Sequence, residues 1–210
     1  MRLLKSTMKK IAVFASGAGT NAQKIIEYLN PFPSPQAKKG DVKTPKIQVA
    51  LIVSNKPDAG VLKIAGNENI PFLLLEKEKF VEGNAYTDEL KEYGIDLIVL
   101  AGFLWKIPPA FIRAFPQRII NIHPALLPKY GGKGMYGKFV HQAVIDNKEK
   151  ESGITIHYVD ELYDHGKIIF QATCPVLQTD TAASLAQRIH QLEHEFYPKV
   201  IEEVLVKKVI

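Results

Sequence analysis

A side-chain amide and an imidazole stand two positions apart at the end of a short apolar run. The run covers residues 118–123, RIINIH, and Pro124 follows it directly. Because side chains alternate between the two faces of a strand, Asn121 and His123 share one face. At the carboxyl end of a strand, where open α/β sheets bind ligands, this pair could stabilise an oxyanion and move a proton. The alternative is a structural histidine before a loop that Pro124 shapes.

Residues 16–21, with the sequence SGAGTN, lie between an apolar run and a segment with helical spacing. Such a turn directs backbone N–H groups and a helix dipole at one point, so we expect it to bind a phosphate. The segment also fits the dinucleotide pattern G-x-G-x-x-A, but Ser54 and Asn55 replace the acidic residue needed at the next strand end, which disfavours NAD. The alternative is a bare turn, which would not require the polar groups of Thr20 and Asn21.

Asp164 is the third candidate, in the polar loop at 160–166. A carboxylate there could orient and charge-stabilise an imidazole from another strand. Periodicity alone does not bring Asp164 to His123, and the acidic residues of the loop equally suit a solvated turn.

One pattern on the last helical segment suggests zinc. His190, Glu193 and His194 match H-x-x-E-H, a zinc-peptidase spacing. Only 16 residues follow His194 to supply a third ligand, so we expect no metal. We interpret the segment as the polar face of a packed helix that touches a substrate. Cys174 lies in an apolar run and is interpreted as a core residue.

The elements that must position these groups alternate along the chain. The strands and helices of the first part predict a parallel sheet covered on both faces, and the last two β-rich runs predict antiparallel strands that complete an open mixed α/β sheet. We expect one domain over 1–210, with a basic lead-in at 1–9 and a surface loop at 31–46. The expected strands are 10–16, 47–53, 71–75, 96–101, 118–123, 153–159 and 167–174, and the expected helices are 21–29, 57–66, 86–93, 138–146 and 181–206.

Composition restricts the function classes. The chain has 210 residues, 46% hydrophobic and 23% charged, as in ordinary globular proteins. The net charge of +5 comes from the chain ends, because without six terminal basic residues 21 basic residues face 22 acidic ones. A nucleic-acid partner is therefore not expected. With a single cysteine, no export signal and no long apolar run, we expect a cytoplasmic protein without a membrane partner.

Together these motifs resemble the folate-dependent formyltransferase family, from about residue 10 to residue 205. The matching segments are VFASGAGTN, LIVLAGF, INIHPALLPKY, GITIHYVDELYDHG and QLEHEFYP. HPALLPKY is shared among formyltransferases, whereas GAGTN points to the glycinamide ribonucleotide branch. The resemblance implies a Rossmann-like fold. It also implies transfer of the formyl group of 10-formyltetrahydrofolate to the amine of N1-(5-phospho-D-ribosyl)glycinamide, in purine biosynthesis.

The resemblance also assigns roles to individual positions. The catalytic residues of the family fall on Asn121, His123 and Asp164, which would act on the tetrahedral intermediate. The substrate-binding residues fall on Gly19, Thr20 and Asn21 for the phosphate, and on Glu193 for the ribose.

The folate co-substrate would lie against two further segments, and this chain departs from the family beside them. Trp105 stands where an Arg is frequent, Gly83 or Asn84 stands near another Arg position, and GGKGMYG lengthens the loop after Lys129. The implied partners are small molecules, with no metal, in a monomer or homodimer. The implied folate-binding residues are Leu104, Trp105, Lys106, Ile107, Asn121, Asp160, Glu161, Leu162, Tyr163 and Asp164.

Two alternatives remain open. Methionyl-tRNA formyltransferase and formyltetrahydrofolate hydrolase share the INIHP segment and the loop of Asp164, but both normally carry another domain, for which 210 residues leave no room. A non-catalytic nucleotide-binding module would use the GAGTN turn alone and would ignore the formyl donor.

Overall fold

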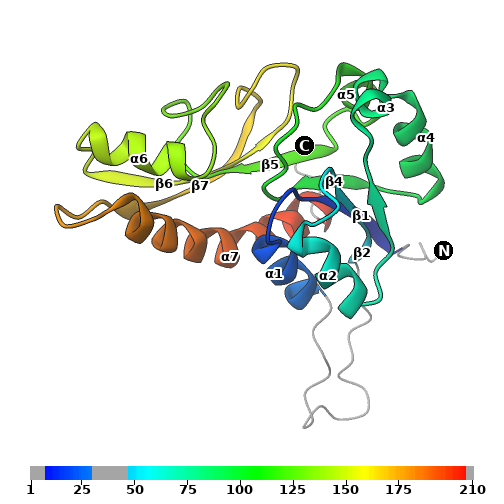
Figure 1. Cartoon of the computed structure of the whole chain (residues 1–210), viewed down its shortest axis with the longest axis horizontal. Helices are drawn as coiled ribbons and strands as arrows, with labels where there is room; N and C mark the ends of the chain where they lie inside the picture. The colour runs from blue at the N-terminus through cyan, green and yellow to red at the C-terminus, as the bar shows by residue number, and fades with distance from the viewer. Residues whose placement is uncertain (1–7, 30–46, 207–210) are drawn as a thin grey trace, which may run out of the picture.

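The computed structural model describes residues 8–29 and 47–206. They form one seven-stranded sheet in the order β3-β2-β1-β4-β5-β6-β7 (Figure 1). The first five strands along the chain pair in parallel, whereas β6 is antiparallel to β5 and β7 is antiparallel to β6. This confirms the predicted open mixed sheet. The strands are β1 (Lys9–Phe14), β2 (Ile47–Ser54), β3 (Phe72–Leu74), β4 (Leu97–Leu100), β5 (Ile119–His123), β6 (Glu151–Tyr158) and β7 (Ile168–Pro175).

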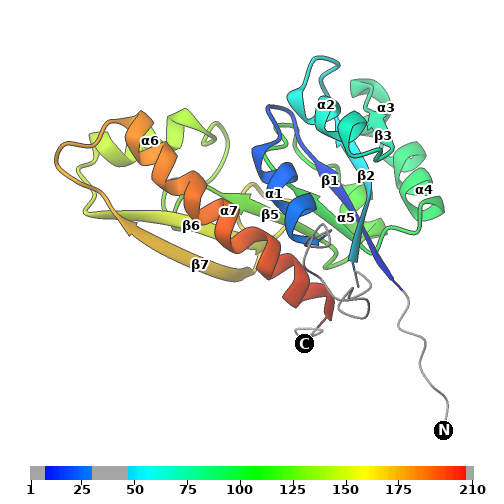
Figure 2. The ribbon, with the colours of Figure 1, turned by 90° about the horizontal axis from the view of Figure 1, so that it is seen from below.

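Helices cover both faces of this sheet. The side chains of β1 point alternately to the two faces, and both sets are buried under helices. Ile11 and Val13 belong to one buried cluster with α1, α2, α6 and α7, while Ala12 and Phe14 belong to a second cluster with α3, α4 and α5. Figure 2 shows α1 and α7 side by side on the first face. The helices are α1 (Thr20–Leu29), α2 (Gly60–Asn67), α3 (Lys77–Glu82), α4 (Asn84–Glu92), α5 (Pro109–Ala114), α6 (Lys138–Asp146) and α7 (Ala182–Val206).

The predicted elements are all present, with bounds that shift by one to three residues at most ends, but two helices were missed. Helices α3 and α5 have six residues each, which is too short for a 3.6-residue apolar period to show. The predicted loop at 31–46, and most of the lead-in at 1–9, lie outside the described residues. No helix in the described ranges is long and apolar enough to cross a bilayer.

The strand order fixes where a ligand can bind. From β1 the chain first moves outward through β2 and β3, and it then returns to β4 and β5 on the other side of β1. The connections therefore diverge between β1 and β4. In open α/β sheets the crevice at the carboxyl ends of two such strands is the usual ligand site.

Candidate active site

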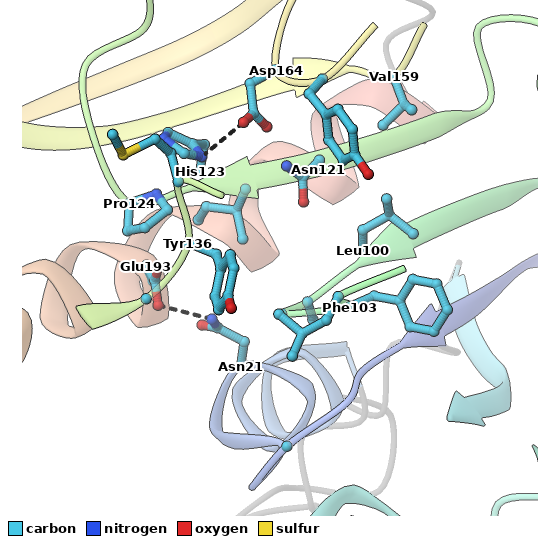
Figure 3. A pocket seen from close by; sticks show the side chains of 18 of the residues that line it. Asn21, Leu100, Phe103, Asn121, His123, Pro124, Tyr136, Val159, Asp164 and Glu193 are labelled. Carbon is cyan, nitrogen blue, oxygen red and sulfur yellow. Dashed lines mark hydrogen bonds and ion pairs between the residues drawn. The ribbon is translucent and has the colours of Figure 1, made fainter. Parts of the chain in front are cut away.

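A cavity of about 450 Å³ opens at this point. Its walls come from the turn after β1, the segment after β4, the end of β5, the loop at 132–137 with His141 of α6, the end of β6 with its following loop, and one face of α7. Figure 3 shows Asn121 and His123 between these walls, with Asp164 on one side and Asn21 and Glu193 on the other. Segments that are far apart in sequence thus meet in one cavity.

The turn after β1 has the form expected for an anion site. Gly19 has a φ of +81°, and a Cβ there would come within 2.8 Å of Val61 on α2, so the position requires glycine. Helix α1 begins at the next residue, Thr20, and its first backbone N–H groups have no partner within the helix. Gly19, Thr20 and Asn21, the residues predicted to bind the phosphate, all line the cavity.

A hydrogen-bonded link joins this turn to α7. Glu193 is only 5% exposed, and its Oε2 accepts from Asn21 Nδ2 and lies near His190 Nδ1, each at 2.9 Å. The hydrogen bond to Glu193 raises the pKa of His190. His190 and Glu193 both line the cavity with the polar face of α7. Within the described residues no group of three or more His, Cys, Asp or Glu could hold a metal.

His123 sits between two protein acceptors. It is 3% exposed, and its Nε2 lies 2.8 Å from the carbonyl oxygen of Tyr130. A carbonyl only accepts, so Nε2 carries a proton. The other nitrogen, Nδ1, lies 3.6 Å from Asp164 Oδ2. This distance exceeds a good hydrogen bond, so Nδ1 faces the carboxylate without being committed to it.

Asp164 reaches this position on a tightly held loop. Its φ of +52° is in the left-handed region, which is uncommon for a residue with a side chain and is often associated with functional sites. Its Oδ2 accepts a hydrogen bond of 3.0 Å from the Gly132 backbone. The two loops approach so closely that a Cβ on Gly131 would lie 3.2 Å from the Asp164 Cβ. The loop backbones therefore aim the carboxylate at His123.

His157 was not predicted as a site residue, yet it belongs to this cluster. It pairs across the sheet with Asn121, and its Nε2 lies 3.2 Å from Asn121 Nδ2. His157 Nδ1 donates to the Tyr158 carbonyl at 2.8 Å, so in the neutral ring Nε2 accepts from the amide. Burial lowers the pKa of His157 and favours this neutral form. The antiparallel pairing of β5 with β6, which places His157 opposite Asn121, is the signal that could have identified His157.

The end of the cavity next to β4 is apolar. Phe103 and Trp105 pack against Phe80, with ring centroids 5.7 and 5.5 Å away. All the predicted folate-binding residues line the cavity except Glu161, which is exposed outside the lining. Exposed Leu104, Leu162 and Tyr163 form the rim, where Lys106 Nζ lies 5.3 Å from the Tyr163 ring centroid. The walls therefore suit a flat, largely apolar ligand.

Fold, motifs and site define one class of protein. Residues 9–201 match the family described as formyl transferase, and the chain belongs to this family. The predicted family resemblance is confirmed.

Named relatives lie in one branch of this family. The chain is 41% identical to the chloroplastic phosphoribosylglycinamide formyltransferase of Arabidopsis thaliana over 206 residues, covering 96% of this chain and 67% of that protein. It is 37% identical to phosphoribosylglycinamide formyltransferase of Bacillus subtilis, covering 94% and 95%. The chain spans only 62% of a second plant relative, from Vigna unguiculata, and 14% of a trifunctional purine biosynthetic protein of Drosophila melanogaster.

A solved structure agrees with this placement. The phosphoribosylglycinamide formyltransferase of Bacillus halodurans superposes with a TM-score of 0.80 at 35% identity, covering 95% of this chain and 97% of that one. The likeness thus extends over almost the whole of both chains.

Proposed function

We propose that this chain transfers the formyl group of 10-formyltetrahydrofolate to the amine of glycinamide ribonucleotide. One observation carries the proposal: the amide of Asn121, the imidazole of His123 and the carboxylate of Asp164 meet between an anion-binding turn and an apolar wall. The names of the relatives support this choice of substrates.

The two substrates fit opposite ends of the cavity. The turn containing Gly19, Thr20 and Asn21 would hold the phosphate through backbone N–H groups, and Glu193 would accept from the ribose hydroxyls with Oε1, because its contacts with Asn21 and His190 both use Oε2. The folate ring system would pack on the apolar segment, with Asp160 in the loop opposite. The amine and the formyl carbon then meet beside β5.

The chemistry is an acyl transfer through a tetrahedral intermediate. The amine attacks the formyl carbon, and negative charge develops on the formyl oxygen. Asn121 Nδ2 has one N–H committed to His157 and a second available for this oxygen. In the protonated ring, His123 also carries an N–H on Nδ1, which can donate to this oxygen as the long contact with Asp164 rearranges.

Collapse of the intermediate breaks the bond between the formyl carbon and N10 of the folate. The proton lost by the attacking amine must reach N10, and the imidazole of His123 is the group placed to move it. Asp164 stabilises the imidazolium formed in that exchange. The products are the N-formyl ribonucleotide and tetrahydrofolate.

The direct test is to incubate the chain with both substrates and follow the ribonucleotide by mass spectrometry. We expect a mass gain of one formyl group that requires the folate donor. Formate release without a formylated ribonucleotide would favour a hydrolase instead. Binding of the ribonucleotide without binding of the folate would favour a non-catalytic module.

We further propose that residues 1–210 act as one domain on small molecules alone, as a monomer or homodimer in the cytoplasm. The relatives support a small-molecule enzyme, and those from plants are named as chloroplastic. Sedimentation of the purified chain and localisation of a tagged chain would test these points.

A further inference from the structure

His141, on α6, is a buried histidine that none of the sequence motifs includes. It is 2% exposed and lies on the cavity wall. Its Nδ1 is one of the few buried side-chain nitrogen or oxygen atoms in the described ranges with no hydrogen-bond partner. Leaving a buried polar group unpaired costs stability, so a nonpolar side chain would suit a purely structural role better.

The surroundings of His141 determine which nitrogen carries its proton. Burial lowers its pKa, and the positive charge of His190 lowers it further, so the ring is neutral near pH 7. A neutral imidazole has one N–H. Among backbone groups, buried donors without acceptors are rarer than buried acceptors without donors. By the same reasoning, the buried and unpaired Nδ1 is assigned the lone pair. The N–H is then on Nε2, for which no partner is found in the described part of the chain.

The charges of the cavity indicate what this donor would meet. Lys106 is the only Lys or Arg among the described lining residues, and it lies at the apolar end. His190 is already engaged with Glu193. A phosphate at the turn after β1 would therefore draw on backbone N–H groups, on the side chains of Thr20 and Asn21, and on a free imidazole instead of a Lys or Arg.

We propose that His141 Nε2–H donates a hydrogen bond to the phosphate of the ribonucleotide substrate, so that the ligand supplies an acceptor that the protein does not give this donor. This inference rests on the proposed function. It makes His141 a binding and specificity residue for the phosphoribosyl half.

The test uses His141→Leu and His141→Gln, because the amide nitrogen of glutamine can occupy the place of Nε2. We expect His141→Leu to raise KM for glycinamide ribonucleotide by about 10- to 100-fold, the effect of losing a hydrogen bond to a charged group. KM for 10-formyltetrahydrofolate should stay within about 2-fold, and His141→Gln should restore most of the loss. The leucine variant should melt at or above the wild-type temperature, because an unpaired nitrogen is gone.

The matched control is Gln142→Leu, on the same helix but outside the catalytic cavity, which should leave both KM values unchanged. Calorimetry with the ribonucleoside that lacks the phosphate should show no difference between wild type and His141→Leu. An unchanged KM for the ribonucleotide, or an equal rise for both substrates, would overturn the inference. Absence of formyl transfer by the wild type would instead count against the proposed function.

A second readout does not depend on the leucine variant folding. In wild-type protein with ¹⁵N-labelled histidine, the Nε2 signal of His141 is identified by its loss in His141→Gln. We expect this signal to move when glycinamide ribonucleotide is added and to stay in place with the ribonucleoside. An Nε2 signal that responds in the same way to the ribonucleotide and to the ribonucleoside would contradict the assignment.

Discussion

The two ends of the cavity are built in different ways. At the polar end, Asn21 and His190 both contact Glu193, so the side chains hold one another before any ligand arrives. At the apolar end, Leu104, Leu162 and Tyr163 are exposed, and a ligand that covers them would bury their side chains. The polar end would thus orient a charged substrate through hydrogen bonds, while the apolar end would bind a flat substrate through apolar contacts.

The reacting groups lie between these ends, on β5 and the loop after β6. Asn121 and His123 are set by strand geometry, whereas Asp164 is set by the backbone of two loops. If this division is correct, variants at the two ends change the KM of different substrates, and variants in the middle change kcat.

The largest effect is expected in the middle, for Asn121→Ala. Loss of one oxyanion donor should lower kcat by about 100- to 1000-fold, with little change in either KM. Steady-state kinetics with each substrate varied would measure this. Asn147→Ala, at the exposed end of α6, is the control and should match wild type. Normal turnover by Asn121→Ala would exclude this amide as an oxyanion donor.

A smaller effect is expected at the polar end, for Glu193→Gln. Loss of the carboxylate weakens the contacts with Asn21, His190 and the ribose, so KM for the ribonucleotide should rise by roughly 10-fold. KM for the folate should not change. Glu195→Gln, exposed on the same helix, provides the comparison. A parallel rise in both KM values would show that the ends do not act separately.

The smallest expected effect is on the pH dependence of folding stability, through His157. Burial lowers the pKa of His157 below the ordinary 6.5, so the unfolded chain takes up a proton at a higher pH than the folded one. The stability linked to His157 is therefore complete above about pH 6.5 and is lost as the pH falls toward the folded pKa.

Melting temperatures between pH 5 and 8 would measure this dependence. His157→Gln should remove part of the acid-side decline, by about 2–4 °C for each kcal/mol involved. His165→Gln, with an exposed side chain, should retain the wild-type slope. An unchanged slope in His157→Gln would mean that His157 is not held neutral by burial.

Local patterns predicted much of the fold. The bounds of α6 were predicted residue for residue, and the alternation of β5 placed Asn121 and His123 on the face that lines the cavity. Helices α3 and α5 were missed because six residues are too few to show the 3.6-residue spacing of apolar side chains.

Contacts between distant segments could not be derived in this way. The proximity of Asp164 to His123 depends on how two loops pack, and only the family resemblance suggested it. His141 lies in none of the matching segments, and His157 lies in one that assigned it no role. The position of His157 depends on its cross-strand neighbour, and that of His141 depends on the packing of α6. The sequence shows which groups could react, whereas tertiary packing decides which of them meet.

The central claim is that the carboxylate of Asp164 acts on His123 during formyl transfer. Single-turnover rates of Asp164→Asn, compared with Glu161→Gln on the same loop, test it most directly. We expect Asp164→Asn to slow the chemical step by about 100-fold or more while both substrates still bind, and Glu161→Gln to match wild type. Equal single-turnover rates for the two variants would contradict the account.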